Sequence, residues 1–473
     1  MLFNSLQFLL FLPAVLFLYY IIKPKHRWIL LLIASYYFYM CWRPEYIILI
    51  IISTIIDYFA ARRMEQLPDI NRRKKYLYLS LVSNLGILFF FKYFNFFSES
   101  TTALFQQFNI FVNFPAFNYL LPVGISFYTF QTLSYTIDVY KGDTKVERHF
   151  GRFALYVSFF PQLVAGPIER SYHLLPQLRK HIHFNYEWMK AGVFLMLWGF
   201  LKKVVIADRL AAYVNEVYNN VDSYSGIPNI LATYFFAFQI YCDFSGYSDI
   251  AIGCALMLGI QLMKNFERPY FALNIQEFWK RWHISLSTWF KDYVYIPLGG
   301  NRVVKWRWYY NLFITFLVSG LWHGANWTFV IWGALHGLYI LFYNMMKEEK
   351  ILDPRKKGRA RQMLNRFFTF HIALLAWVFF RANHLGDVDN MIIGMFQPTV
   401  GSINLFTFKI DLYLSILFIG LLVMIEWLIE HKNLLQKFEH SGRWMKWLAL
   451  IVGITIILLF GVFEEVDFLY FQF

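Results

Sequence analysis

Long apolar segments separated by short polar stretches run through the whole chain. A helix needs about 20 apolar residues to cross a bilayer, and many of these segments approach that length. Residues 1–22 carry no charge, so they predict a first transmembrane helix that is retained rather than a signal peptide. The further candidate spans are 28–42, 44–61, 76–97, 119–140, 188–209, 229–263, 308–325, 327–346, 367–381, 410–430 and 447–463.

The pattern therefore predicts an all-α, polytopic integral membrane protein with about 10–12 transmembrane helices. Two shorter apolar stretches, 103–118 and 153–168, are expected to be re-entrant or interfacial helices. No soluble domain fits in the remaining sequence, and no internal repeat is visible. We therefore expect residues 1–473 to form a single transmembrane domain.

Composition narrows the class further. Hydrophobic residues make up 58% of the chain and charged residues only 16%, whereas soluble proteins carry roughly 25% charged residues. A disordered chain and a water-soluble globular protein are therefore excluded. The three cysteines, Cys41, Cys242 and Cys254, lie in apolar stretches without a C-x-x-C pair, so we expect buried thiols and no metal site.

The formal net charge of +14 is best explained by membrane topology rather than by nucleic-acid binding. Lys and Arg gather at 62–75 and 347–366, whereas 93–140 and 210–263 contain neither. Because cytoplasmic loops collect positive charge, the loops at 62–75 and 347–366 are expected to face the cytosol. The loop at 210–227 is expected to face outward.

Charged residues inside apolar segments are functional candidates by default. Lys202, Lys203 and Arg209 fall within 188–209, a segment that is expected to snorkel or to lie partly in the interface. Asp243 and Asp249 are six residues apart, so on one helix they would point to different faces and would not pair for acid–base work. Anchoring of neighbouring donors and a role in a substrate path both remain open for these acids.

The segment 274–295 has apolar and aromatic residues at helical spacing and basic residues, among them Arg281, on the other side. It predicts one amphipathic helix in or near the cytoplasmic interface. His283 falls on its apolar stripe. By position alone, a packing role is favoured for that histidine over a chemical one.

The stretch 308–346 would be about 58 Å long as one helix, so it is expected to break at Gly324-Ala325-Asn326. His323 and His336 each stand beside paired small residues, which let helices approach closely. A neutral imidazole in such a dry setting suits a general base for a hydroxyl. Simple hairpin geometry places His336 nearer mid-depth, and so favours it.

Common catalytic motifs are absent from the sequence. It contains no G-x-S-x-G elbow, Walker A loop, G-x-G-x-x-G or H-E-x-x-H. Serine-hydrolase, P-loop, dinucleotide and zincin chemistries therefore have no support.

Several strings, in order along nearly the whole chain, resemble the membrane-bound O-acyltransferase (MBOAT) family. The likeness is greatest to its bacterial polysaccharide branch, the membrane subunits of alginate-type O-acetyltransferases. The matching strings are 121–131, 158–170, 241–249, 278–287, 296–302, 319–327 and the ending 470–473.

The resemblance implies site residues. The family's near-invariant histidine in a W-H-G segment corresponds to His323, and a second polar residue some forty positions upstream corresponds to His283. The resemblance therefore favours His323 over His336 and implies a catalytic role for His283. Substrate-binding roles are expected for Asp243, Arg281, Trp322, Asn326 and His336.

The resemblance also implies an activity. We expect an O-acyltransferase that moves an acetyl group from a cytosolic thioester, acetyl-CoA or a carrier-protein thioester, to an exported polysaccharide such as alginate. No tightly bound cofactor is expected. The expected partner is an extracytoplasmic acetyltransferase or esterase-like protein, and the expected location is the bacterial cytoplasmic membrane.

Two other readings remain open. A secondary transporter or flippase could use the intramembrane Asp and His residues as a proton relay, although such proteins usually show internal repeats. The other alternative is a membrane scaffold for a biosynthetic complex.

Overall fold

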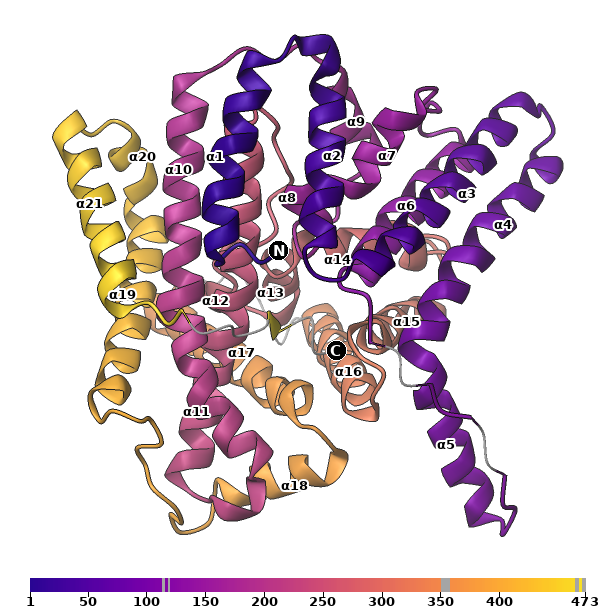
Figure 1. Cartoon of the computed structure of the whole chain (residues 1–473). Helices are drawn as coiled ribbons and strands as arrows, with labels where there is room; N and C mark the ends of the chain where they lie inside the picture. Colours follow the sequence, from indigo (N-terminus) through magenta and orange to yellow (C-terminus); the bar gives the residue numbers. More distant parts are fainter. Residues whose placement is uncertain (113–114, 118–119, 350–357, 464–467, 470–473) are drawn as a thin grey trace. The chain divides into compact units, whose positions relative to one another are not determined.

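The computed structural model describes residues 1–112, 115–117, 120–349, 358–463 and 468–469 (Figure 1). Helices form nearly all of the regular structure in these residues. The described part contains no β-sheet, and its one isolated β-bridge joins Ser225 to Val400. The predicted all-α architecture is therefore confirmed.

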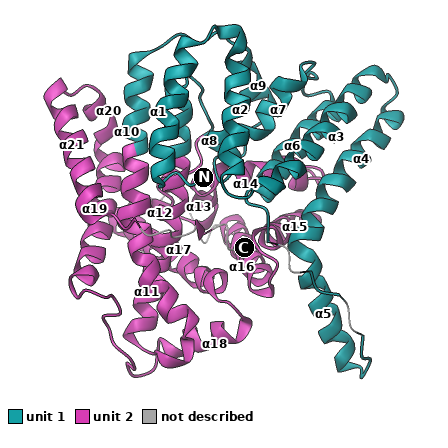
Figure 2. Cartoon of the chain, in the orientation of Figure 1, with its two compact units in different colours: residues 1–196, 250–263, 473 teal, residues 197–249, 264–472 magenta. Residues whose placement is uncertain are grey.

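The chain divides into two compact units, and each combines segments that are distant in sequence (Figure 2). Unit 1 comprises residues 1–196 and 250–263. Its helices are α1 (Leu6–Ile21), α2 (Arg27–Met40), α3 (Ile47–Gln66), α4 (Ile70–Leu88), α5 (Phe94–Gln107), α6 (Ile125–Lys141), α7 (Phe150–Ser158), α8 (Phe160–Leu163) and α9 (Ser171–Arg179).

Unit 2 comprises residues 197–249 and the described residues from Lys264 onward. The unit boundaries fall inside α10 (Tyr186–Phe200) and α12 (Ile227–Met257). The other helices of unit 2 are α11 (Asp208–Asn219), α13 (Ile275–Arg281), α14 (Ile284–Phe290), α15 (Lys305–His323), α16 (Trp327–Glu348), α17 (Arg359–Arg381), α18 (Leu385–Gly394), α19 (Ile410–Lys432), α20 (Leu434–Glu439) and α21 (Arg443–Phe460).

Short turns of other helix types join or interrupt these elements. The 3-10 turns are Pro24–His26, Pro44–Tyr46, Val221–Ser223 and Pro269–Phe271, and the π-helical turns are Phe89–Tyr93, Leu201–Ala207 and Lys291–Tyr295. A π turn widens the helix by one residue per turn and is often found at functional positions.

Six helical segments in the described residues are long and apolar enough to cross a membrane. They are Pro44–Gln66, Ile70–Gln107, Trp327–Glu348, Arg359–Arg381, Ile410–Lys432 and Arg443–Phe460. The polytopic character predicted from the sequence is thereby confirmed, and the larger count of spans stays a prediction.

Two sequence-based boundaries need correction. The span expected at 76–97 is longer, because α4 continues through a π turn into α5 and ends only at Gln107. The first residues of the stretch 103–118 thus belong to that helix, and 113–114 and 118–119 lie outside the described residues. The stretch 153–168 falls on the short helices α7 and α8, which are largely buried in unit 1.

The core of unit 1 contains a hydrogen-bonded polar cluster that joins α3, α4 and α6. Asp57 is fully buried, and its carboxylate accepts hydrogen bonds from Asn84 Nδ2 at 2.9 and 3.0 Å and from Ser80 Oγ at 2.6 Å. Ser80 Oγ also lies 2.9 Å from the hydroxyl of Thr136 on α6. A buried carboxylate is costly unless its oxygens are satisfied, so this network fixes how the three helices pack.

The basic residues at 202, 203 and 209 do not snorkel. Lys203 Nζ lies 2.7 Å from a carboxylate oxygen of both Asp208 and Asp243. Lys202 Nζ lies 2.7 Å from Asp249 Oδ2, and the guanidinium of Arg209 pairs with Asp411. Internal ion pairs in unit 2 therefore compensate these charges.

Candidate functional site

The hairpin of α15 and α16 carries two of the candidate histidines. Helix α15 ends at His323 itself, and Asn326 caps α16, its side chain accepting a 3.1 Å hydrogen bond from the Thr328 amide. The break predicted at Gly324-Ala325-Asn326 is confirmed. It places His323 at the last residue of its helix rather than inside a continuous one.

Two glycines hold the arms of this hairpin together. A Cβ built on Gly320 would lie 2.9 Å from Gly333 Cα and would also clash with the Phe329 carbonyl oxygen. A Cβ on Gly333 would lie 2.5 Å from the Phe316 carbonyl oxygen. The backbones of α15 and α16 therefore touch, as expected of small residues at a helix seam.

His323 is buried in an aromatic enclosure, with only 2% of its surface exposed. Its ring centroid lies 4.9 Å from those of Trp322 and Trp332 and 5.4 Å from that of Phe380 on α17. Such walls exclude water, and a neutral imidazole in a dry site keeps a nitrogen lone pair that can take up a proton.

His336 follows Trp332 by one turn of α16 and lies beside it. Its ring centroid is 4.9 Å from that of Trp332, and its Nδ1 accepts a 3.3 Å hydrogen bond from Trp279 Nε1 on α13. His336 is fully buried. Trp332 therefore brings both hairpin histidines into one neighbourhood, and Trp279 fixes the ring of the second.

The segment 274–295 is not the single helix that the sequence predicts. Helix α13 ends at Arg281 and α14 begins at Ile284, with His283 between them at φ 42° in the left-handed region. A non-glycine residue rarely adopts this conformation, which is strained for a bulky side chain. His283 therefore lies at a break between two helices rather than on the stripe of one continuous helix.

Asn265 determines the tautomer of His283. Asn265 Oδ1 accepts hydrogen bonds from the Ser285 amide at 3.2 Å and the Ser285 hydroxyl at 2.9 Å, and it lies 3.1 Å from His283 Nδ1. Because that oxygen can only accept, Nδ1 must carry the proton. In the neutral ring, Nε2 is then the nitrogen that accepts.

Burial acts on the same ring. His283 is fully buried, and desolvation holds its pKa well below the usual value for histidine. The neutral form therefore dominates near pH 7. Its ring centroid lies 4.5 Å from that of Phe244 and 6.3 Å from that of Trp322, so Trp322 neighbours both His283 and His323.

The remaining predicted substrate-binding residues hold structural contacts. Asp243 pairs with Lys203, and its Oδ2 accepts a 2.8 Å hydrogen bond from the Leu469 amide. Arg281 forms ion pairs with Glu277 at 2.7 Å and Glu430 at 2.9 Å. These contacts favour the anchoring role for both residues, and their substrate-binding roles stay predictions.

Asn326 also holds structural contacts, whereas Trp322 borders a candidate histidine. Besides capping α16, Asn326 donates a 2.8 Å hydrogen bond to the Asn383 carbonyl oxygen. Trp322 packs directly against His323, so of these two it is the one that borders the candidate base. The structure thus gathers His323, His336, His283 and Trp322 within unit 2.

Several residues of this site escape sequence reasoning. Asn265 precedes His283 by 18 residues and carries no motif, and Trp332 and Phe380 look like ordinary apolar helix residues. The sequence does indicate that the two helices of the hairpin pack closely, through the paired small residues around His323 and His336.

Comparisons with known proteins identify the family of this chain. The model of the membrane-bound O-acyltransferase family matches residues 148–382, which include His283, His323 and His336. A protein named Probable alginate O-acetylase AlgI from Azotobacter vinelandii is 42% identical over 84% of this chain and 78% of its own length.

More distant relatives act on other polymers of the cell surface. The Peptidoglycan O-acetyltransferase of Helicobacter pylori is 36% identical over 84% of this chain and 80% of its own length. The Teichoic acid D-alanyltransferase of Bacillus subtilis is 28% identical over 56% of this chain and 70% of its own length. With buried histidines in a polytopic helical fold and relatives of this identity, the chain belongs to the membrane-bound O-acyltransferase family and is an O-acyltransferase.

Proposed function

We propose that this O-acyltransferase moves an acetyl group from a cytosolic thioester across the membrane for O-acetylation of an exported polysaccharide such as alginate. The relatives support the polymer class, since two of them are named for acetylation of alginate and of peptidoglycan. The observation that carries the proposal is the pair of buried histidines, His323 and His283, that both neighbour Trp322.

His323 is the proposed general base. Its neutral imidazole takes the proton of an acceptor hydroxyl as the oxygen attacks the thioester carbonyl carbon. The new C–O bond forms, the C–S bond breaks, and the leaving thiolate takes the proton back from the imidazolium. The aromatic enclosure keeps bulk water from competing with the acceptor for the acyl group.

His283 is the proposed orienting residue. With Nδ1 committed to Asn265, its neutral ring offers Nε2 as an acceptor, which suits holding a second hydroxyl of the acceptor, beside the reacting one, better than donating to an oxyanion. A charged His283 could donate from Nε2, but burial disfavours the charge. Orientation of the acceptor is therefore the role that the local chemistry supports.

Donor and partner follow from the proposed direction of transfer. Acetyl-CoA, or a carrier-protein thioester, is the proposed donor on the cytosolic face, and no tightly bound cofactor is needed. An extracytoplasmic acetyltransferase or esterase-like protein is the proposed partner that completes the modification. The proposed location is the cytoplasmic membrane of a bacterium, and a tunnel joining the two faces is part of the proposal.

The rival function is a transporter with an Asp and His relay. In the structure Asp249 and Asp243 are paired with Lys202 and Lys203, an arrangement that compensates their charge. A scaffold role is the other alternative. Acetyl transfer by the purified chain separates both from the proposed enzyme.

The test compares His323→Gln with His336→Gln. Glutamine keeps a polar group and much of the volume but takes up no proton at neutral pH, so His323→Gln should lower transfer about 10²–10⁴-fold or abolish it. His336→Gln should keep substantial activity, because its amide can still accept from Trp279. The measurement is acetyl transfer per folded molecule in purified protein. An active His323→Gln with an inactive His336→Gln would assign the base to His336.

A further inference from the structure

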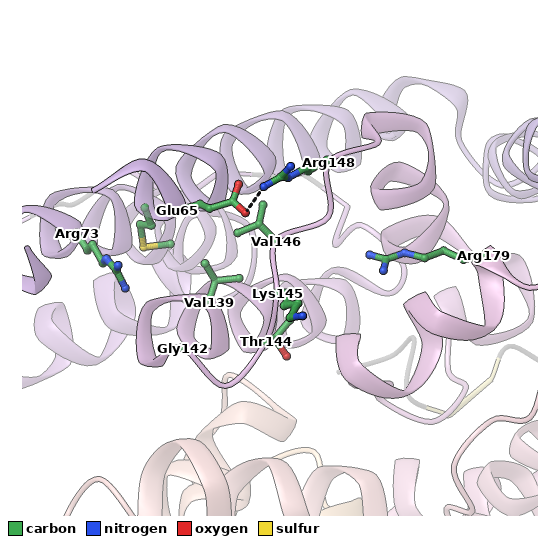
Figure 3. A pocket seen from close by; sticks show the side chains of 10 residues that line it. Glu65, Arg73, Val139, Gly142, Thr144, Lys145, Val146, Arg148 and Arg179 are labelled. Carbon is green, nitrogen blue, oxygen red and sulfur yellow. Dashed lines mark hydrogen bonds and ion pairs between the residues drawn. The ribbon is translucent and has the colours of Figure 1, made fainter. Parts of the chain in front are cut away.

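A basic pocket lies in unit 1, and none of its residues belongs to the candidate functional site. The end of α3, the start of α4, the end of α6, the loop 142–148 and the end of α9 enclose it (Figure 3). Its volume is about 360 Å³, within the range of small-molecule sites. The cationic side chains that line it are Arg73, Lys145, Arg148 and Arg179.

Carboxylates neutralise only part of this charge. Arg148 Nη2 lies 3.2 Å from Glu65 Oε1, and Arg179 Nη2 lies 2.6 Å from Glu147 Oε2. Lys145 is exposed and forms no ion pair with any residue that the structure describes. Four cations against two carboxylates leave an excess of two positive charges around the cavity.

The loop that carries these side chains is held in place. Gly142, at φ 84°, ends α6, and the Asp143 amide bonds the Asp138 carbonyl at 2.9 Å. The Glu147 amide donates a 3.0 Å hydrogen bond to the hydroxyl of Tyr135, and Glu147 itself is buried. The backbone that carries Lys145 and Arg148 is therefore fixed, which lowers the entropic cost of binding relative to a mobile loop.

Arg73 and one further group on the wall, the Thr144 hydroxyl, suit an anion. Arg73 is anchored by a 2.6 Å hydrogen bond from Nε to the Leu67 carbonyl, and a guanidinium has four other N–H donors. The Thr144 hydroxyl lines the pocket and is buried, without a hydrogen-bond partner among the described residues. A ligand oxygen at the pocket would satisfy this group, whose burial otherwise carries a cost.

We propose that this pocket binds a phosphate-bearing anion. Guanidinium forks and an ammonium group match phosphate oxygens in charge and geometry, and the hydroxyl adds one more donor. The pocket is built beside residues 62–75, the loop predicted to face the cytosol. The phosphate can therefore come from the headgroup of an anionic lipid in the inner leaflet or from a soluble phosphate compound of the cytosol.

The experiment measures binding of sodium pyrophosphate to the full chain in phosphatidylcholine nanodiscs. The Lys145→Ala/Arg148→Ala variant should bind at least about tenfold more weakly, since it loses two charged donors. The matched control is Lys74→Ala/Lys75→Ala, which removes two exposed charges on α4 that do not line the pocket. The control should bind as the unaltered chain does.

A second arm separates the two sources of phosphate. If a lipid headgroup occupies the pocket, phosphatidylglycerol nanodiscs should weaken pyrophosphate binding to the unaltered chain, and native mass spectrometry should detect retained phosphatidylglycerol that the double variant loses. If the source is soluble, pyrophosphate binding should be the same in both discs.

The single variant Lys145→Ala guards against misfolding, because Lys145 is exposed and holds no described ion pair. It should lower the affinity severalfold while leaving the thermal unfolding curve unchanged. The proposal is wrong if the double variant and the unaltered chain bind pyrophosphate equally and retain phosphatidylglycerol equally.

Discussion

Asn265 is the residue on which the chemistry of His283 depends. Its oxygen is committed to acceptance by the Ser285 amide, so it forces the proton of His283 onto Nδ1. The Asn265 amide is uncharged and does not favour a charged ring, and burial keeps the His283 ring neutral. Which nitrogen of His283 can accept a hydrogen bond is thus decided by Asn265 as well as by the histidine itself.

Asn265→Asp should therefore change the pH profile of the enzyme. The carboxylate keeps the acceptor oxygen but favours the charged ring, so the pKa of His283 should rise. Since activity in this proposal needs the neutral ring, the acid limb of the kcat/KM profile should move to higher pH. Ser285→Ala removes a hydrogen bond to the same oxygen without adding charge, and its acid limb should stay in place. Identical limbs in both variants would argue against an orienting His283.

Trp279 should behave as a packing residue with one polar function. It is buried against Phe316 and Trp332 and donates to His336. Trp279→Ala should cost about 3–5 kcal/mol of stability and lower the folded yield, while turnover per folded molecule falls much less. Trp306→Ala is the control, because Trp306 is 68% exposed. Monodisperse yield on size-exclusion chromatography reports the difference.

Sequence reasoning found the histidines but not their partners. His323 and His336 were visible because ionisable residues stand out in apolar helices beside glycine. Asn265 and Phe380 were not, because an amide in a polar loop and a phenylalanine in an apolar helix are common in any membrane protein. Which ring faces which is decided by packing in unit 2, and local spacing does not encode it.

At the scale of elements, the α15–α16 hairpin depends on two glycines, which have no side chain to hold the helices apart. Gly320 and Gly333 allow the backbones to touch, and His323 follows three residues after the first of them. Anything that separates the arms therefore shifts the end of α15. The position of the proposed base is thus tied to this seam.

Gly320→Ala tests the seam. Its methyl group would meet the backbone of α16, so we expect a loss of about 1–3 kcal/mol, as for other overpacked cores, together with reduced transfer. Gly420→Ala, on α19, is the matched control, since a Cβ there meets nothing within 4 Å. Thermal unfolding in detergent should separate the two variants. Equal midpoints would mean that α15 and α16 can move apart without cost.

Breaks in helices were predicted unevenly. Gly324-Ala325-Asn326 marks the turn of the hairpin by composition, and the structure breaks there. No glycine or proline marks the interruption at His283 in the sequence. The interruption is formed by His283 in the left-handed conformation, with its ring bonded to Asn265. Tertiary contacts overrode a regular helical pattern at that point.

At the scale of the whole molecule, the alternation of basic and neutral loops predicts topology. Single cysteines at Asn71, Arg359 and Asn220, all exposed positions, can be labelled on intact cells in a Cys41→Ser background. That background is needed because Cys41 is exposed, and the expectation of a buried thiol is wrong for this cysteine. A membrane-impermeant thiol reagent should label position 220 and spare 71 and 359. Labelling at 71 or 359 with none at 220 would invert the orientation.

Hydropathy alone predicted the class of the fold, because the bilayer leaves a chain few ways to satisfy its backbone. It did not predict the pairing of Lys202, Lys203 and Arg209 with acids, since Asp249, Asp243 and Asp411 lie on other helices and only Asp208 lies nearby in the sequence. Charges inside an apolar segment show that partners must exist. They do not show which acids those partners are.

Those pairs bear on how the chain is made. Asp249 follows Lys202 by 47 residues, and Asp411 follows Arg209 by 202 residues, so both basic groups leave the ribosome long before their acids. A nascent segment with uncompensated lysines partitions poorly into lipid. It should therefore wait at the insertion machinery until α12 supplies Asp249, while Arg209 gains its partner only when α19 is made. Biogenesis of this region should thus proceed by groups of helices rather than one helix at a time.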